Sequence, residues 1–166
     1  LFFTEEHKML RNMVRDFAVN EVEPISKKMD ETESIPSELI DKMGELGIMG
    51  IPVPEKYGGA GMDMVAYATA ITELAKVDAS VAITVAAHTS LGTMPIILAG
   101  SEEQKLKYIP ALASGKKIGA FGLTEPSAGS DAGATLTTAE KSGDEYIING
   151  SKIFITNSGI ATYLSL

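Results

Sequence analysis

Two stretches of this sequence combine hydrogen-bond donors with small or flat side chains, and the first is FGLTEPSAGSDAGA, residues 121–134. It follows an apolar run that predicts a strand, so Leu123 and Thr124 present backbone N–H groups and a hydroxyl at the strand's tip. Gly129 and its small neighbours would let the main chain come close to a planar ligand. These donors suit a heteroaromatic ring with acceptors at its edge. The alternative is a surface turn in which Asp131 bonds its own backbone.

The second stretch is YIINGSKIFITNS, residues 146–158. Asn149-Gly150 predicts a hairpin turn, and the alternation that follows predicts a strand over residues 152–156. In such a strand Phe154 and Thr156 face the same side, where an aromatic plane and a hydroxyl donor could hold the face and edge of a flat ring. The alternative is an ordinary strand with Phe154 in the core.

Composition excludes several other kinds of chemistry. The 166 residues carry a net charge of −8 and the pI is about 4.8, so we expect no nucleic-acid partner. Cysteine is absent, which excludes disulfides and thiolate nucleophiles and fits a reducing compartment. The two histidines, His7 and His88, lack the spacing of metal ligands, so we expect no metal site.

The elements that position these stretches follow from periodicity and capping residues. Apolar residues at three-and-four spacing predict helices over residues 4–29, 34–47, 63–77, 80–99 and 101–114, with caps at Thr4 and Ser101 and a structured Gly- and Pro-rich loop at 47–63. Short strands are predicted at 118–123, 136–139, 145–148, 152–156 and from 163 to the end, separated by turns such as Ser142-Gly143-Asp144. The fold class is therefore α+β. We expect an all-α domain over residues 1–115 and, over 116–166, the truncated beginning of an antiparallel β-barrel-like domain.

The run from Val81 to Ala99 comes nearest to a membrane span, but polar residues interrupt it and we interpret it as a buried helix. No membrane span is therefore expected. The chain begins at Leu1 without a basic-then-apolar signal segment, and the missing Met suggests that this start is not the native one.

Four motifs occur in order: VPEKYGGAGMD, HTSLGTMPIILAGSEEQK, FGLTEPSAGSDAGA and INGSKIFITN. Together they resemble the N-terminal part of the acyl-CoA dehydrogenase family, and the resemblance covers essentially the whole chain. It implies an N-terminal helical domain, a middle β domain and a C-terminal helical bundle, with FAD between the last two. The C-terminal bundle is expected to be absent from these residues.

The resemblance also implies roles for individual residues. In the first flavin segment Leu123 and Thr124 bond the pyrimidine side of the flavin, and Ser130 reaches both FAD and the CoA part of the substrate. In the second, Phe154 covers one flavin face, as Trp does in many members, and the Thr156 hydroxyl lies near N5. The implied FAD-binding residues are Phe121, Gly122, Leu123, Thr124, Gly129, Ser130, Phe154, Ile155 and Thr156.

The implied acyl pocket lies beside the helix around residues 83–91, where Ala86 and Ala87 leave room and Leu91 narrows the space. Ser130, Ala87 and Leu91 are therefore the expected substrate-binding residues. The alternative is simple helix packing by small residues. Ser127 departs from the family pattern, because Gly is usual after Glu-Pro, and it puts the backbone angles of this loop in question.

The implied activity is α,β-dehydrogenation of an acyl-CoA thioester, with hydride passing to flavin N5 and electrons passing to an electron-transfer flavoprotein. The catalytic base is expected in the missing bundle, so no catalytic residue is assigned here, and Glu125 is expected to fix its own loop. The residues alone should be inactive. The resemblance further implies a homotetramer in fatty acid metabolism, in bacterial cytoplasm or the mitochondrial matrix. An oxidase that uses oxygen and a flavin-free helical assembly module are the alternatives.

Overall fold

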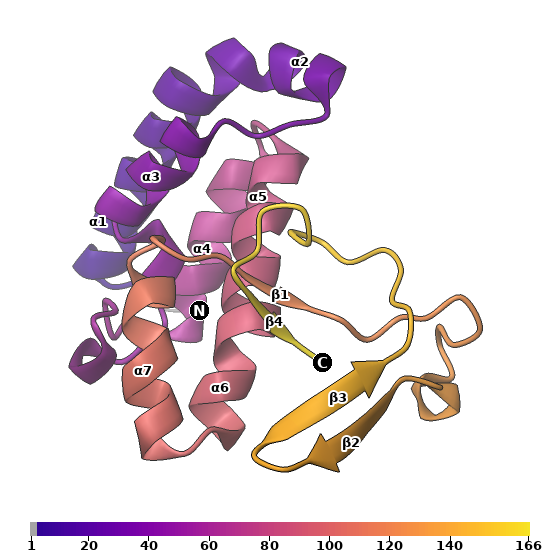
Figure 1. Ribbon diagram of the computed structural model, residues 1–166. Helices are drawn as coiled ribbons and strands as arrows, with labels where there is room; N and C mark the ends of the chain where they lie inside the picture. Colours follow the sequence, from indigo (N-terminus) through magenta and orange to yellow (C-terminus); the bar gives the residue numbers. More distant parts are fainter. Residues whose placement is uncertain (1–2) are drawn as a thin grey trace.

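The computed structural model describes residues 3–166, in which a helical body carries a smaller β portion on one side (Figure 1). This arrangement confirms the α+β class predicted from the sequence. The helices are α1 (Glu5–Phe17), α2 (Glu23–Thr32), α3 (Ser37–Glu45), α4 (Met64–Ala75), α5 (Ala79–Ala86), α6 (Met94–Ala99) and α7 (Glu102–Ala113). The strands are β1 (Gly119–Phe121), β2 (Thr138–Ser142), β3 (Glu145–Asn149) and β4 (Tyr163–Ser165).

The helices α1, α4, α5 and α7 begin at polar capping residues. Thr4 and Ser101 each close a capping box at the start of α1 and α7, as the sequence predicts. Asp63 accepts the Ala66 N–H at 2.8 Å and thereby caps α4. A cap of this kind satisfies one of the four N–H groups that a helix start leaves without a partner.

Two π-helical segments join helices into longer rods. Ala18–Val22 connects α1 to α2, so the predicted helix at 4–29 continues to Thr32. Ala87–Thr93 connects α5 to α6 in the same way and makes one 21-residue helix, Ala79–Ala99. Such wide turns are rare and often occur at functional sites.

The helix Ala79–Ala99 is long and apolar enough to cross a membrane by length and composition. Half of its most apolar window is buried within the domain, however, and the α5 part of the helix contacts α4 while its π-helical part contacts β1. This environment is that of a core helix, which agrees with the interpretation of the sequence.

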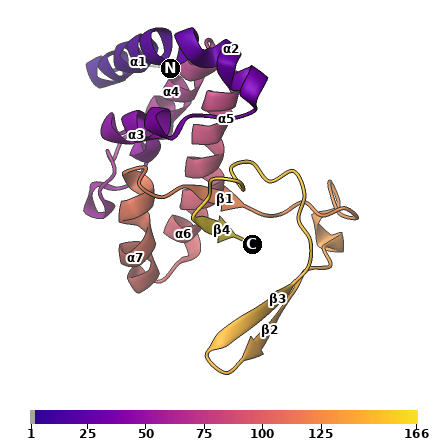
Figure 2. The same cartoon turned by 45° about the horizontal axis from the view of Figure 1, so that its top comes forward.

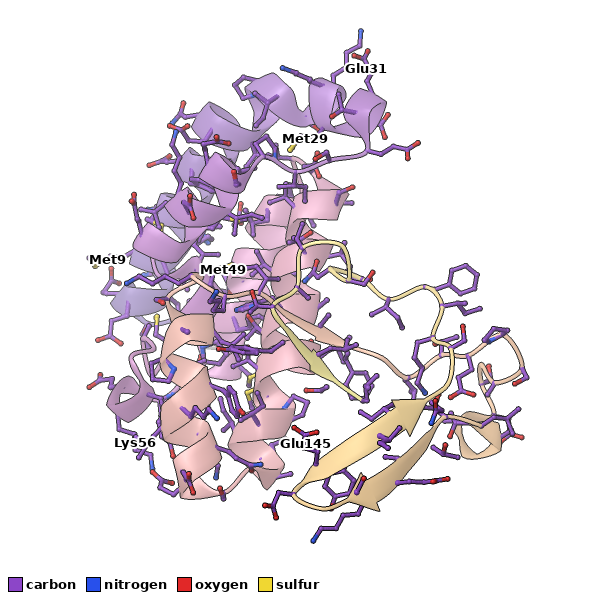
Figure 3. All side chains as sticks on the ribbon, viewed as in Figure 1. Met9, Met29, Glu31, Met49, Lys56 and Glu145 are labelled. Atoms are coloured by element: carbon purple, nitrogen blue, oxygen red, sulfur yellow. The ribbon has the colours of Figure 1, made fainter. Side chains whose placement is uncertain are left out.

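The core lies where α1, α3, α4 and α5 meet. Met49 is fully buried between the helices, whereas Met9 on the outer side of α1 is 70% exposed (Figure 3). At the edge of this core Arg15 on α1 donates to the buried carboxylate of Glu73 on α4 at 3.0 and 3.2 Å. The bidentate pair fixes the two helices against each other.

The strands form two separate pairs. β1 pairs in parallel with β4, and β2 pairs with β3 in an antiparallel hairpin that projects from the helical body (Figure 2). Every residue of β2 and β3 is exposed. These two strands therefore have no core to cover within residues 3–166.

Two predictions about this portion are wrong. Residues 152–156 form no strand, because Phe154 takes a φ of +57°, which no strand residue adopts. No hairpin turn forms at Asn149-Gly150, whereas the predicted turn at Ser142-Gly143-Asp144 does join β2 to β3. Gly150 instead permits a close approach, since a Cβ there would lie 2.2 Å from the Thr137 hydroxyl.

The central helix meets β1 at two glycines. A Cβ on Gly92 would lie 2.5 Å from the carbonyl carbon of Gly119, and one on Gly119 would lie 3.0 Å from Gly92 Cα. The two main chains therefore touch with no side chain between them. This contact sets how close the β portion can lie to the central helix.

We predict that Gly92→Ala destabilises the intact protein by about 1–3 kcal/mol, because the new methyl group must push β1 away from the helix. This loss exceeds the gain in helix propensity, which is about 1 kcal/mol or less. Urea unfolding of the intact protein measures the change. Gly159→Ala is the matched control, because no atom lies within 4 Å of its new Cβ. Equal stability of Gly92→Ala and wild type would show that the contact is loose.

Candidate functional site

The structure brings the two chemistry-bearing stretches side by side. The Ile153 N–H donates to the Thr124 carbonyl at 2.9 Å, and the Lys152 ammonium donates to the Leu123 carbonyl at 3.0 Å. The segment from 150 to 162 then returns from the hairpin toward α5 and β4 (Figure 2). Residues separated by about thirty positions thus share one surface.

The buried side chain of Glu125 joins the two segments. Glu125 is 4% exposed, and its carboxylate accepts a hydrogen bond from the Lys152 ammonium, with Nζ 2.7 Å from Oε1. It also accepts the main-chain N–H groups of Leu136 at 2.6 Å and of Thr137 at 3.0 Å. One carboxylate therefore ties the first segment to the second and to the start of the hairpin, and the expectation that Glu125 fixes its own loop is confirmed.

The electrostatics of Glu125 follow from these donors. The Lys152 ammonium, with the groups at Thr137 and Leu136 next in importance, lowers the pKa of Glu125 to about 2. A general base works best with a pKa near the operating pH. Glu125 is therefore poorly suited to take a proton from a substrate.

The turn after Glu125 is closed by reciprocal main-chain bonds between Glu125 and Ala128, at 2.9 and 3.1 Å. Ser127 lies inside this turn and does not have a positive φ. The position therefore does not need the freedom of glycine, and Ser127 fits it without strain.

The tip of the first segment carries free donors. Phe121 and Gly122 lie in or beside β1, where Gly122 is buried and donates to Ser165. Leu123 and Thr124 follow them, and their N–H groups have no acceptor among residues 3–166. Main-chain donors of this kind can bind acceptors on the edge of a planar ring.

The remaining predicted residues of the first segment, Gly129 and Ser130, are exposed. A Cβ added at Gly129 would meet no atom within 4 Å, so the space beside the main chain there is open to a ligand. The Ser130 hydroxyl makes no hydrogen bond within the described part of the chain. Both residues are therefore accessible, and their contacts with a cofactor or substrate stay predictions.

The second segment is exposed and strained. Phe154 is 89% exposed, so its ring is not part of the core, while Ile155 is half-buried and Thr156 is exposed. Phe154 and Asn157 have φ values of +57° and +69°. A positive φ at a non-glycine residue costs on the order of 1–3 kcal/mol and is typical of functional sites. An exposed aromatic ring on a constrained backbone offers a stacking surface for a flat ligand.

The central helix lies beside both segments, because the Asn157 amide donates to the Thr84 carbonyl of α5 at 2.9 Å. Ile83 and Leu91 are 53% and 45% exposed on this helix. Ala87 is 3% exposed and faces the interior instead. Within residues 3–166 the Leu91 side chain is therefore accessible to a ligand, whereas the Ala87 side chain is not.

His88 and Asn157 have structural roles that sequence reasoning missed. His88 is fully buried, and burial lowers the pKa of His88 to about 4, so the ring is neutral at pH 7. Its Nδ1 accepts the Gly119 N–H at 3.0 Å, which leaves Nε2 to donate to the Leu112 carbonyl at 3.1 Å. Its place as the one titratable residue of the helix Ala79–Ala99 is the signal that could have found His88.

The arrangement can hold a flat heteroaromatic ring but offers no metal centre. Within residues 3–166 no group of three or more His, Cys, Asp or Glu side chains is placed to hold a metal ion. The free donors of Leu123 and Thr124, the exposed Phe154 ring and the Thr156 hydroxyl match the edge and face of an isoalloxazine. The residues present therefore fit a flavin.

Comparison with known families identifies the class of protein. Residues 4–116 match the model of the acyl-CoA dehydrogenase N-terminal domain, and residues 120–166 match that of the acyl-CoA dehydrogenase middle domain. The chain therefore belongs to the acyl-CoA dehydrogenase family.

Individual relatives share this sequence at high identity. The chain is 56% identical over 158 residues to an acyl-CoA dehydrogenase of Bacillus subtilis. It is 54% identical over 158 residues to a short-chain specific acyl-CoA dehydrogenase of Clostridium acetobutylicum. Each alignment covers 95% of this chain but 42% of the relative. The chain thus spans less than half the length of these proteins.

Solved structures agree with the fold. Butyryl-CoA dehydrogenase from Megasphaera elsdenii aligns with a TM-score of 0.93 at 44% identity, over 99% of this chain and 44% of that one. An acyl-CoA dehydrogenase complexed with FAD from Bacillus anthracis gives 0.92 at 44% identity, over 98% and 28%. A structure described as the electron transferring flavoprotein of Acidaminococcus fermentans gives 0.95 at 49%, over 98% and 43%.

We predict that Glu125→Gln changes how stability depends on pH. Because the pKa of Glu125 lies below its usual value of 4.5, the stabilisation by the carboxylate is complete above about pH 4.5 and is lost as the pH falls toward 2. The variant should therefore melt at a lower temperature than wild type at neutral pH, and the gap should narrow below about pH 4.5.

Thermal midpoints of the intact protein between about pH 7 and pH 3 measure this gap. Glu140→Gln on the exposed strand β2 is the matched control and should follow wild type throughout. A gap that stays constant over the whole range would contradict the role given to the Glu125 carboxylate.

Proposed function

We propose that the intact protein is an FAD-dependent acyl-CoA dehydrogenase that introduces a double bond between the α and β carbons of an acyl-CoA thioester. The observation that carries this proposal is the bond from the Ile153 N–H to the Thr124 carbonyl. The exposed Phe154 directly follows Ile153 in the chain. The free N–H groups of the first segment belong to Thr124 itself and to its neighbour Leu123. The relative from Bacillus anthracis that was solved with FAD supports the choice of cofactor.

Each residue of the site has a separate task in this proposal. The N–H groups of Leu123 and Thr124 bind acceptors on the pyrimidine edge, and Phe154 covers one face of the ring and excludes water from it. The Thr156 hydroxyl donates to the opposite edge. FAD, when bound, supplies an acceptor for the hydride that leaves the β-carbon of the substrate. Glu125 keeps the two segments in register and takes no part in proton transfer.

We propose a short acyl chain for the substrate. The relatives named short-chain specific acyl-CoA dehydrogenase and butyryl-CoA dehydrogenase support this choice. The exposed Leu91 side chain on the central helix is the residue that limits the length of the acyl chain. Each methylene that meets such a wall changes discrimination by about 1–3 kcal/mol.

We further propose an electron-transfer flavoprotein as the electron acceptor and a homotetramer as the assembled form. The similarity to the Acidaminococcus fermentans structure supports the acceptor. The tetramer follows from the family alone. Bacterial cytoplasm or the mitochondrial matrix is the proposed location.

The intact protein tests the proposed function directly. We expect it to contain or take up FAD, and we expect butanoyl-CoA to bleach the flavin absorbance without air faster than a long-chain acyl-CoA does. An electron-transfer flavoprotein should then reoxidise the flavin faster than air does. Absence of FAD uptake would favour a flavin-free module, and faster reoxidation by air would favour an oxidase.

We predict that Thr156→Val weakens FAD retention or slows flavin reduction several-fold. Valine keeps the β-branched shape but removes the hydroxyl, and one neutral hydrogen bond contributes about 0.5–1.5 kcal/mol. FAD content, flavin spectrum and single-turnover reduction rate of the intact protein measure the effect. Ser158→Ala removes an exposed hydroxyl two residues away and should leave all three unchanged. Identical values for Thr156→Val and wild type would remove Thr156 from the site.

A further inference from the structure

Asn157 joins three parts of the molecule with one side chain. Its amide nitrogen donates to the Thr84 carbonyl of α5 at 2.9 Å and to the Gly119 carbonyl of β1 at 3.4 Å. The residue itself directly follows the second flavin segment. A single amide therefore connects that segment to the central helix and to the strand that begins the first flavin segment.

Gly119, one of the two acceptors, is itself fixed from several sides. Its N–H donates to the buried ring of His88 at 3.0 Å, and its Cα lies against Gly92 of the central helix. Both main-chain polar atoms of Gly119 thus bind side chains. Asn157 therefore binds to a point in the fold that cannot move independently of the helix.

The second flavin segment has few other means of keeping its conformation. Phe154 is almost fully exposed, and both Phe154 and Asn157 have positive φ values. At its start the segment is held by the bond from Ile153 to Thr124. At its end the Asn157 amide holds it to the helical body. A strained backbone persists only where its surroundings determine it. Local turn bonds add to these two attachments, because the Ser158 N–H donates to the Ile155 carbonyl and the Ile160 and Ala161 N–H groups donate to the Asn157 carbonyl. Of these contacts, only the Asn157 amide binds the helical body through a side chain.

Asparagine suits this position for two separate reasons. It tolerates a positive φ better than most residues, and its NH₂ group offers two N–H donors for two carbonyl acceptors. A test must separate these two properties. Glycine keeps the backbone conformation while it removes the amide, so Asn157→Gly isolates the side chain.

We propose that Asn157 is a positioning residue for the flavin, which fixes the Phe154–Thr156 segment relative to the central helix and to β1. The residue does not touch the reacting atoms and acts through its neighbours. The proposal rests on the proposed function, because the segment that Asn157 orients is assigned to the flavin there.

The test compares Asn157→Gly with wild type and with Glu33→Gly in the intact protein. Glu33 also has a positive φ, of +51°, and ends α2 far along the chain from the site, so it controls for the change to glycine itself. For Asn157→Gly we expect a roughly tenfold slower flavin reduction and an altered flavin spectrum, with KM for the acyl-CoA within about twofold of wild type. Glu33→Gly should match wild type in all three.

Hydrogen exchange in the FAD-free protein gives a readout that needs no cofactor. The Ile153 amide directly precedes this segment and donates to the Thr124 carbonyl of the first segment. It should exchange faster in Asn157→Gly, while the thermal midpoint stays close to that of Glu33→Gly. A lower midpoint with unchanged spectrum and reduction rate would make Asn157 a purely structural residue and overturn the proposal. Unchanged spectrum, rate and exchange would overturn it as well.

The same experiment distinguishes a failure of the proposed function from a failure of the positioning role of Asn157. Wild type that takes up no FAD overturns the proposed function and the role of Asn157 with it. Wild type and Glu33→Gly that take up FAD and reduce it, together with an Asn157→Gly that does so equally well, overturn the positioning role alone.

Discussion

The contact between Gly92 and Gly119 sets the distance between the central helix and β1, and the rest of the site is arranged around that distance. Two main chains that touch leave no side chain that could adjust by changing rotamer. The buried His88 ring then fixes the register by accepting the Gly119 N–H and donating to the Leu112 carbonyl of α7. The helical body thus offers the start of β1 a fixed point of attachment.

A second constraint acts within the β portion, where β2 and β3 are fully exposed and supply no core of their own. The buried pair of Glu125 and Lys152 holds the loops there instead. Removing two charges from water is costly, and such a pair adds little net stability unless further donors satisfy it. The N–H groups of Leu136 and Thr137 occupy further acceptor sites of this carboxylate. These donors offset part of the cost of burial, and the pair fixes the geometry of the loops that it joins.

Local sequence patterns predicted the helices and pointed to the second segment of the site, but they did not predict its conformation. The caps at Thr4 and Ser101 and the apolar periodicity predicted where helices form, because these signals act within a few residues. The prediction of a strand at 152–156 was wrong, because the positive φ of Phe154 depends on attachments to residues distant in sequence. The prediction of a hairpin turn at Asn149-Gly150 was wrong for a related reason. Its glycine serves a close approach to Thr137, which no local pattern encodes.

These constraints imply a division of tasks within the proposed enzyme. The open donors, the exposed Phe154 ring and the Asn157 attachment all concern the position of a flat ring. The one buried carboxylate near them, Glu125, has a pKa of about 2 and four oxygen lone-pair sites that already serve three donors. In the proposed enzyme Glu125 is therefore not the group that takes the proton from the substrate. Changes to Phe154, Thr156 and Asn157 should then alter flavin retention and reduction rate, while the pH dependence of catalysis follows a group other than Glu125.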